Sequence, residues 1–129
     1  MEKDFIRAAK NGDAARIKEL LAESPALIDA RDSDDSTALH CACWKGHLEV
    51  VQVLIAAGAL VNVHNKNDHW GTTPLHAAAH ANEAKIAEAL IDAGADVNAV
   101  DANGNTPLLH TTFHKATAAA KVLTKNGAL

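Results

Sequence analysis

Histidines and cysteines are the residues of this chain best suited to metal binding or catalysis, and it holds eight and two of them. His76 and His80 are four residues apart, as are His110 and His114, so on a helix each pair would share a face and could hold a metal ion. No carboxylate or thiolate stands at a further ligand spacing nearby in the sequence. We therefore expect no metal site and no other cofactor.

The other candidate motifs for chemistry are incomplete. Cys41 and Cys43 have no second cysteine pair to complete a zinc site, so we interpret them as free, at least half-buried thiols. Residues 32–36, Asp-Ser-Asp-Asp-Ser, begin like a calcium loop but lack its glycine and its final glutamate, which favours a solvated turn. No motif that would activate a serine nucleophile is present. The sequence therefore predicts a protein that is not an enzyme.

Composition excludes further classes of function. The net charge is −4 and the pI is about 6.0, which argues against a surface for nucleic acid or for anionic membranes. No apolar stretch approaches the roughly 20 residues that cross a bilayer, and the first residues are too polar for a signal peptide. We expect a cytoplasmic protein, with the nucleus as an open alternative. The 28 alanines, against four aromatic residues, indicate a core of closely packed helices.

The sequence repeats with a period of 36 and then 33 residues, which must set the arrangement of these side chains. One motif occurs as Thr37-Ala-Leu-His40, Thr73-Pro-Leu-His76 and Thr106-Pro-Leu-Leu109. A second recurs at the same spacings as Gly58-Ala-Leu-Val-Asn62, Gly94-Ala-Asp-Val-Asn98 and Gly127-Ala128. Between them, residues 46–55 and 82–91 carry apolar positions at helical spacing.

These motifs resemble the ankyrin repeat family over essentially the whole chain. The resemblance implies an all-α solenoid of stacked helix-turn-helix units with short β-turn fingers. We divide the single domain into an N-terminal capping unit at 1–31, repeats at 32–63 and 64–99, and a C-terminal capping unit at 100–129. Charged Arg16 and Glu19 stand where the next unit has Val50 and Val53, which suits an end unit.

The repeated residues also have local physical roles. A threonine at 37, 73 and 106 can cap the helix that follows it, and the prolines at 74 and 107 suit a first helical position. Gly46 and Asn82 stand where the turn between two helices needs a left-handed backbone. Glycines at 58, 94 and 127 are expected to end the second helices.

The resemblance assigns roles to the histidines and to the partner-binding residues. It implies that His40 and His76 are structural and hydrogen-bond across neighbouring units, which leaves His80, His110 and His114 uncommitted. It also implies a protein partner bound on the concave face by turn residues and first-helix ends. The positions are Lys10, Asn11, Ser33, Asp34, Ser36, Trp44, Lys45, His69, Trp70, Thr72, His80, Ala81, Ala102, Asn103, Asn105, Phe113 and His114.

Three of the four aromatic residues, Trp44, Trp70 and Phe113, fall on these positions. Large apolar side chains at exposed positions favour an interface, and tryptophan is enriched among interface hot spots. The alternative is that the rings pack on neighbouring units and fill a shallow groove. We predict a non-catalytic protein-binding module centred on the two tryptophans, monomeric when free. Two other functions stay open: a small-ligand or metal-binding protein using His69, His80, Phe113 and His114, and self-association through the exposed rings.

Two departures from the repeat pattern carry further expectations. Three extra residues lie between Val63 and Gly71, and because this segment presents His69 and Trp70 we favour a lengthened finger that widens the binding face over neutral loop drift. In the last unit, Leu109 replaces the motif histidine and Lys115 replaces the turn glycine. We expect that unit to be the least stable.

Overall fold

The computed structural model describes residues 1–66, 70–113 and 115–129. In these ranges the chain forms paired helices joined by tight turns, with the pairs connected by longer loops, as the sequence predicts. The elements are α1 (Glu2–Asn11), α2 (Ala14–Glu23), the 3-10 helix η1 (Pro25–Asp29), α3 (Ala38–Lys45), α4 (Leu48–Ala56), α5 (Pro74–His80), α6 (Ala84–Asp92), α7 (Pro107–Phe113) and α8 (Thr117–Lys125).

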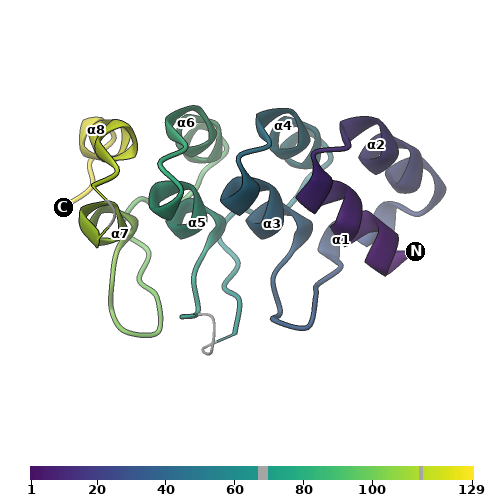
Figure 1. The fold of residues 1–129 in the computed structure, drawn as a ribbon, viewed down its shortest axis with the longest axis horizontal. Coiled ribbons are helices and arrows are strands. Elements are labelled where there is room, and N and C mark those ends of the chain that lie inside the picture. Colours follow the sequence, from purple (N-terminus) through teal and green to yellow (C-terminus); the bar gives the residue numbers. More distant parts are fainter. Residues whose placement is uncertain (67–69, 114) are drawn as a thin grey trace.

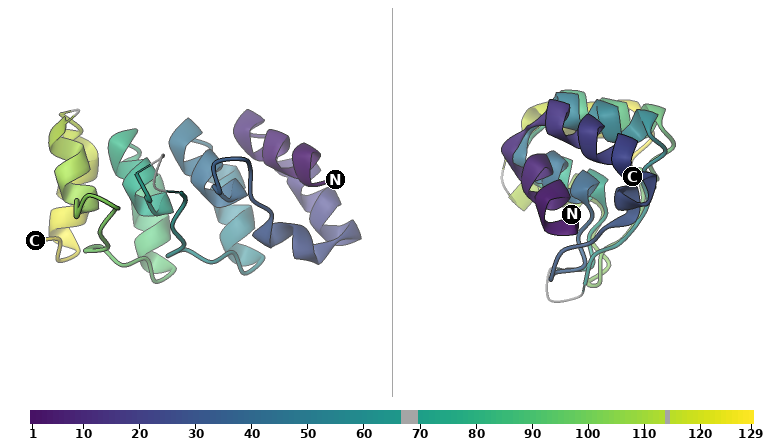
Figure 2. Two further views of the ribbon diagram at one scale, coloured as in Figure 1. Left: turned by 90° about the horizontal axis from the view of Figure 1, so that it is seen from below. Right: turned by 90° about the vertical axis from the view of Figure 1, so that its right-hand side faces the viewer.

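The helices form two layers (Figure 1). The first helices of the pairs, α1, α3, α5 and α7, pack in sequence order in one layer, and the second helices, α2, α4, α6 and α8, do so in the other. The loops before α3, α5 and α7 project away from both layers, to the bottom of Figure 1 and toward the viewer in the left view of Figure 2. We call the described residues of these loops the fingers: 30–37, 63–66 with 70–73, and 99–106.

The starts of the first helices follow the predicted capping chemistry. The hydroxyls of Thr37 and Thr73 accept hydrogen bonds from the backbone amides of His40 and His76 at 3.3 and 3.4 Å. In turn, Nδ1 of each imidazole accepts a hydrogen bond from the backbone amide of the capping threonine. This reciprocal arrangement is a capping box with histidine in place of the usual glutamate.

The turns within the helix pairs use the left-handed backbone. Gly12, Gly46, Asn82 and Lys115 occupy equivalent turns with φ of 75°, 79°, 58° and 52°, which confirms the expectation for Gly46 and Asn82. At Gly12 a Cβ atom would also lie 2.6 Å from Nδ1 of His47. At the equivalent turn, Lys115 adopts a left-handed backbone conformation, which is higher in energy for a lysine than for a glycine.

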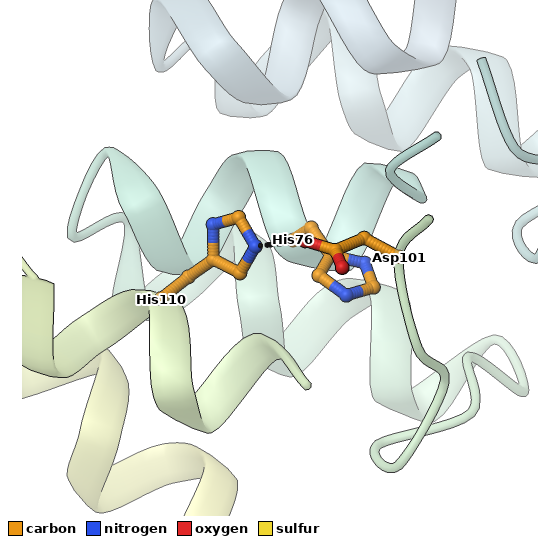
Figure 3. A group of neighbouring side chains, drawn as sticks. All are labelled: His76, Asp101 and His110. Atoms are coloured by element: carbon orange, nitrogen blue, oxygen red, sulfur yellow. Dashed lines mark hydrogen bonds and ion pairs between the residues drawn. The ribbon is translucent and has the colours of Figure 1, made fainter. Parts of the chain in front are cut away.

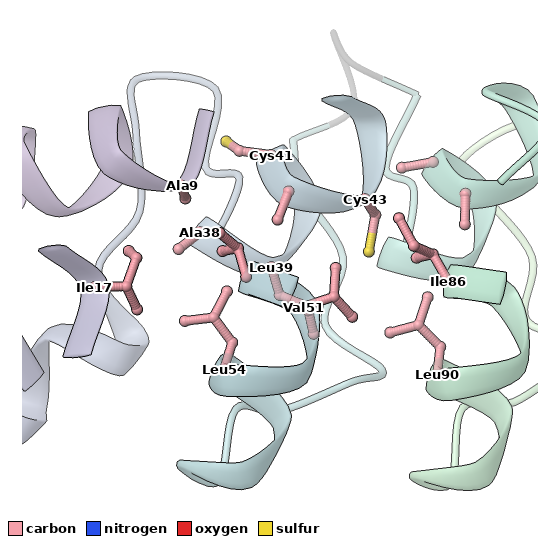
Figure 4. Close-up of a cluster of buried hydrophobic side chains, with 14 of the residues drawn as sticks. Ala9, Ile17, Ala38, Leu39, Cys41, Cys43, Val51, Leu54, Ile86 and Leu90 are labelled. Atoms are coloured by element: carbon pink, nitrogen blue, oxygen red, sulfur yellow. The ribbon is translucent and has the colours of Figure 1, made fainter. Parts of the chain in front are cut away.

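The core lies between the layers and between neighbouring pairs (Figure 4). Ile17, Leu54 and Leu90 come from three successive second helices and are fully buried. The first helices meet through small side chains, including Ala9, Ala38, Ala42 and Ala78, all without solvent exposure. Cys41 and Cys43 are buried free thiols, as expected. The stack is thus held by alanine-mediated close approach in one layer and larger aliphatic residues in the other.

Two fingers share the same turn. Asp32 Oδ1 accepts the amides of Asp34 and Ser36 at 2.9 and 3.0 Å, and Asp101 Oδ1 accepts those of Asn103 and Asn105, both at 2.9 Å. Residues 32–36 thus form a side-chain-stabilised turn, in line with the sequence interpretation. Adjacent fingers also bond directly, since the amide of Lys66 donates to Asp34 and that of Ala102 donates to Trp70. These bonds fix the spacing between fingers.

Candidate functional site

A groove of about 490 Å³ runs along the junction between the fingers and the first helices. Its walls extend from Lys10 on α1, across α3 and α5, to Phe113 on α7, so side chains from all four helix pairs contribute to it. We call this the inner groove. It lies on the surface that the family resemblance indicates for partner binding.

Most of the predicted partner-binding residues line the inner groove. They are Lys10, Asp34, Ser36, Trp44, Lys45, Trp70, Thr72, His80 and Phe113. The predicted residues Asn11, Ser33, Ala81, Ala102, Asn103 and Asn105 are outside its lining, and their binding roles stay predictions. His69 and His114 lie outside the described residues, as do residues 67–69 of the segment that holds the three-residue insertion, and the expected lengthened finger stays a prediction.

Sequence reasoning missed a second set of lining residues. These are Asp32, His40, Cys41, Asn65, His76, Ala77 and His110. Several belong to the repeat motif itself, which the sequence identifies as structural. The repeat register could have indicated some of them, because Cys41, Ala77 and His110 each stand four residues after a capping threonine.

The three large rings are exposed, as predicted. Trp44, Trp70 and Phe113 have exposed fractions of 50 %, 47 % and 50 %. Each also packs against an imidazole: Trp44 stacks on His80 with centroids 4.5 Å apart, while Trp70 and Phe113 lie 5.7 and 5.8 Å from His110. The rings therefore have well-defined inner contacts and leave about half of their surface available for a partner.

His40 and His76 are structural, as the resemblance implies. Because Nδ1 of each ring accepts the threonine amide, Nε2 carries the proton. That N–H donates across the unit boundary, from His40 to the carbonyl of Thr72 and from His76 to that of Asn105, each at 2.8 Å. Burial lowers the pKa of both imidazoles to about 4, so both are neutral near neutral pH.

His110 does not behave as the sequence predicts (Figure 3). It is buried, and its Nε2 lies 2.8 Å from Oδ2 of Asp101, which is also buried. Burial tends to raise the pKa of Asp101, but hydrogen bonds from the Asn105 amide, His110 and the Asn103 amide outweigh it, and the net pKa is lowered. The sequence left His110 uncommitted, whereas the structure pairs it with the carboxylate of Asp101, nine residues earlier in the chain.

The signal for this pair was present in the repeat register. Asp32 stands five residues before Thr37 and Cys41 four residues after it, and the Cys41 thiol points to the Asp32 carboxylate at 3.9 Å. Asp101 and His110 occupy the same two positions around Thr106. Burial, followed by the charge of Asp32, raises the pKa of the Cys41 thiol to about 11, so the groove thiol is unreactive near neutral pH.

The geometry of His76, Asp101 and His110 can be tested against a metal site. One ligand atom from each lies within 4.8 Å of the others. However, both nitrogens of His76 already hold hydrogen bonds, and Nδ1 of His110 has no partner among the described residues to orient a metal-bound ring. The His76 and His80 pair that the helical spacing offered is disfavoured because His76 is already engaged in this way. The cluster fits a hydrogen-bond network better than a metal centre.

The helices of the described ranges 1–66, 70–113 and 115–129 include none long and apolar enough to cross a bilayer.

Comparison with known proteins identifies the family. A sequence model described as ankyrin repeats (three copies) matches residues 5–65 and 59–129, so this chain belongs to the ankyrin repeat family. Ankyrin repeats generally mediate protein–protein interaction, and the family is generally non-catalytic.

The chain is similar to segments of larger proteins. It is 42 % identical over 66 residues to human ankyrin repeat domain-containing protein 49, which covers 48 % of this chain and 28 % of that protein. It is 43 % identical over 58 residues to the serine/threonine-protein kinase VIK of Arabidopsis thaliana, covering 45 % and 13 % of the two chains. It is 41 % identical over 73 residues to rat oxysterol-binding protein-related protein 1, covering 50 % and 8 %. The chain thus matches less than a third of the length of each of these relatives.

Proposed function

We propose that the protein binds a protein partner in the inner groove, with Trp44 and Trp70 as the main anchors and without catalysis. The observation that carries this proposal is the gathering of three half-exposed rings in one groove, where the repeat requires no aromatic side chain. An interface of standard size would bury roughly 800 Å² on this chain, centred on these rings.

The rigidity of the groove supports this function. Finger-to-finger hydrogen bonds and the two bridging histidines hold the groove walls before any partner arrives. A preformed site loses little conformational entropy on binding, so more of the contact energy appears as affinity. The apolar rings supply that energy, while Lys10, Lys45 and Asp34 at the α1 and α3 end supply polar contacts that select the partner.

Three further proposals concern the oligomeric state, the classes of partner and the cellular compartment. We propose that the protein is a monomer when free and binds neither nucleic acid nor membrane, consistent with its net charge of −4. The two free buried thiols suit a reducing compartment, and we propose the cytoplasm.

The test is a comparative capture experiment from lysate of the source cells. The baits are the wild-type protein, a Trp44→Ala/Trp70→Ala variant and a Leu60→Ala control. Leu60 is also a large exposed apolar residue, at 63 %, but it lies outside the inner groove. Circular dichroism first establishes that all three baits have the same helical content.

The proposal predicts at least one protein that the wild type and the Leu60 control retain and the double variant loses. Equal recovery by all three baits would contradict binding through the two tryptophans. Sedimentation at several concentrations distinguishes the remaining possibility, because association of the wild type that the double variant abolishes would make a second copy the partner.

A further inference from the structure

We propose that the inner groove takes a tyrosine side chain of the protein partner, whose hydroxyl bonds Nδ1 of His110 while its ring packs between Trp70 and Phe113. This inference rests on the proposed function and specifies the chemistry of the group that the groove recognises.

The starting observation is a buried polar atom without a partner. Nδ1 of His110 is shielded from solvent and has no hydrogen-bond partner in the part of the chain that the structure describes. The residue itself has an exposed fraction of 3 % and lines the inner groove. A buried polar nitrogen left unsatisfied is costly, so a ligand that satisfies it gains affinity.

Asp101 fixes which nitrogen is left over. Its carboxylate already accepts two backbone amides through Oδ1, and Oδ2 faces Nε2 of His110 at 2.8 Å. The proton on Nε2 therefore donates to Asp101, and the ring is held with Nδ1 on its opposite side (Figure 3). In the neutral ring Nδ1 accepts a hydrogen bond, and in the protonated ring it donates one.

The neighbours of His110 select an aromatic group. Trp70 and Phe113 have ring centroids within 6 Å of the imidazole, and the rings of His76 and His80 lie at 5.0 and 6.3 Å. Trp70 and Phe113 are each about half exposed, and they line the inner groove together with His110. This end of the groove therefore has aromatic walls, with Nδ1 of His110 beside them.

A phenol matches this combination. Its ring stacks on aromatic neighbours, and its hydroxyl donates to Nδ1, the acceptor that the Nε2 bond to Asp101 leaves over. A phenylalanine ring stacks in the same way but leaves the nitrogen unsatisfied. These 129 residues contain no tyrosine, so the same residues of a second copy do not supply the group, and we assign it to a partner protein.

A pair of probes that differ by one hydroxyl tests the inference with the full chain. N-acetyl-tyrosinamide and N-acetyl-phenylalaninamide are titrated separately, and NMR follows the two tryptophan indole resonances and the His110 imidazole. Both tryptophans of the chain lie in the groove, so their resonances report binding there. Apolar transfer alone would favour the phenylalanine probe.

We expect the tyrosine probe to shift the Trp70 and His110 resonances and to bind about tenfold more tightly than its phenylalanine counterpart. His110→Gln should remove this preference, whereas His64→Gln, a histidine outside the groove, should keep it. Equal or stronger binding of the phenylalanine probe, or no shift at Trp70 with either probe, would overturn the inference. Since the two probes are compared on the wild type, the result does not depend on the variants folding.

A second experiment uses the captured partner protein. Once captured, its tyrosines are replaced one at a time by phenylalanine, and one replacement should weaken the complex about tenfold. If the partner depends on Trp44 and Trp70 but on none of its tyrosines, the inference fails and the proposed function stands. If the tyrosine probe binds with its hydroxyl preference while the captured proteins ignore the tryptophans, the proposed function fails and the groove is a site for small phenols.

Discussion

The imidazole of His76, on α5, donates from Nε2 to the backbone carbonyl of Asn105 in the next finger, at 2.8 Å. The same ring also accepts the Thr73 amide through Nδ1. One side chain therefore caps its own helix and attaches the following finger, which ends beside Pro107 at the start of α7. The third motif position holds Leu109, which is 40 % exposed and makes no such bridge.

Replacing His76 should therefore destabilise the stack. His76→Ala removes both hydrogen bonds, leaves the Thr73 amide without its partner and leaves the Asn105 carbonyl with the Asp101 amide alone, so we expect a loss of about 2–4 kcal/mol in the free energy of unfolding. Leu109→Ala, at the same motif position, is the matched control and should cost less than about 1 kcal/mol. Urea unfolding followed by circular dichroism measures both. Equal losses would show that the bridge contributes little.

The buried histidines should make stability depend on pH. His40 and His76 have pKa values of about 4 in the folded protein, against an ordinary value of 6.5. Between these pH values the unfolded chain binds more protons, so the free energy of unfolding should fall as the pH falls through this window. The full loss is up to about 3 kcal/mol for each histidine. Urea unfolding at intervals across this range measures it, and a flat profile would contradict the burial of neutral imidazoles.

Lys115, in the turn before α8, offers a stabilising substitution. Lys115 has a φ of 52°, and its counterparts Gly12 and Gly46 are glycines. Lys115→Gly should relieve the left-handed strain and raise the free energy of unfolding by about 1 kcal/mol, as measured by urea unfolding.

Hydrogen exchange of the α7 and α8 amides, compared with the α5 and α6 amides, tests whether the last unit is the least stable. Fastest exchange elsewhere, or a destabilised variant, would be the contrary result.

Metal addition provides a separate check on the histidine cluster. Because both His76 nitrogens hold hydrogen bonds, we expect zinc at an equimolar concentration to leave the melting temperature unchanged. Differential scanning fluorimetry with and without zinc measures the shift. A clear increase that His110→Gln abolishes would show that the metal displaces the hydrogen bonds.

The repeat pattern of the sequence predicts most of the local structure of this protein. The capping threonines, the left-handed turns at Gly46 and Asn82, and the bridging role of His40 and His76 all follow from residue types at fixed spacings. The exposure of Trp44 was likewise predictable, because only the repeat register was needed to place it. These features depend on one unit or on the contact between two.

The Asp101–His110 pair was missed for a different reason. Its two residues are nine apart and meet only because the finger folds back over α7, so helical spacing alone does not bring them together. Helical spacing instead suggests His114 as the neighbour of His110. The repeat register does indicate the pair, because Asp32 and Cys41 occupy the same two positions in an earlier unit and also meet.

The most direct measurement of the central claim is the dissociation constant of the captured partner with three purified proteins: wild type, Trp44→Ala/Trp70→Ala and Leu60→Ala. Calorimetric titration of each suits this comparison. We predict that the double variant binds at least about 30-fold more weakly, which corresponds to about 2 kcal/mol or more, while the control binds like the wild type. Equal affinity of the wild type and the double variant would contradict binding in the inner groove.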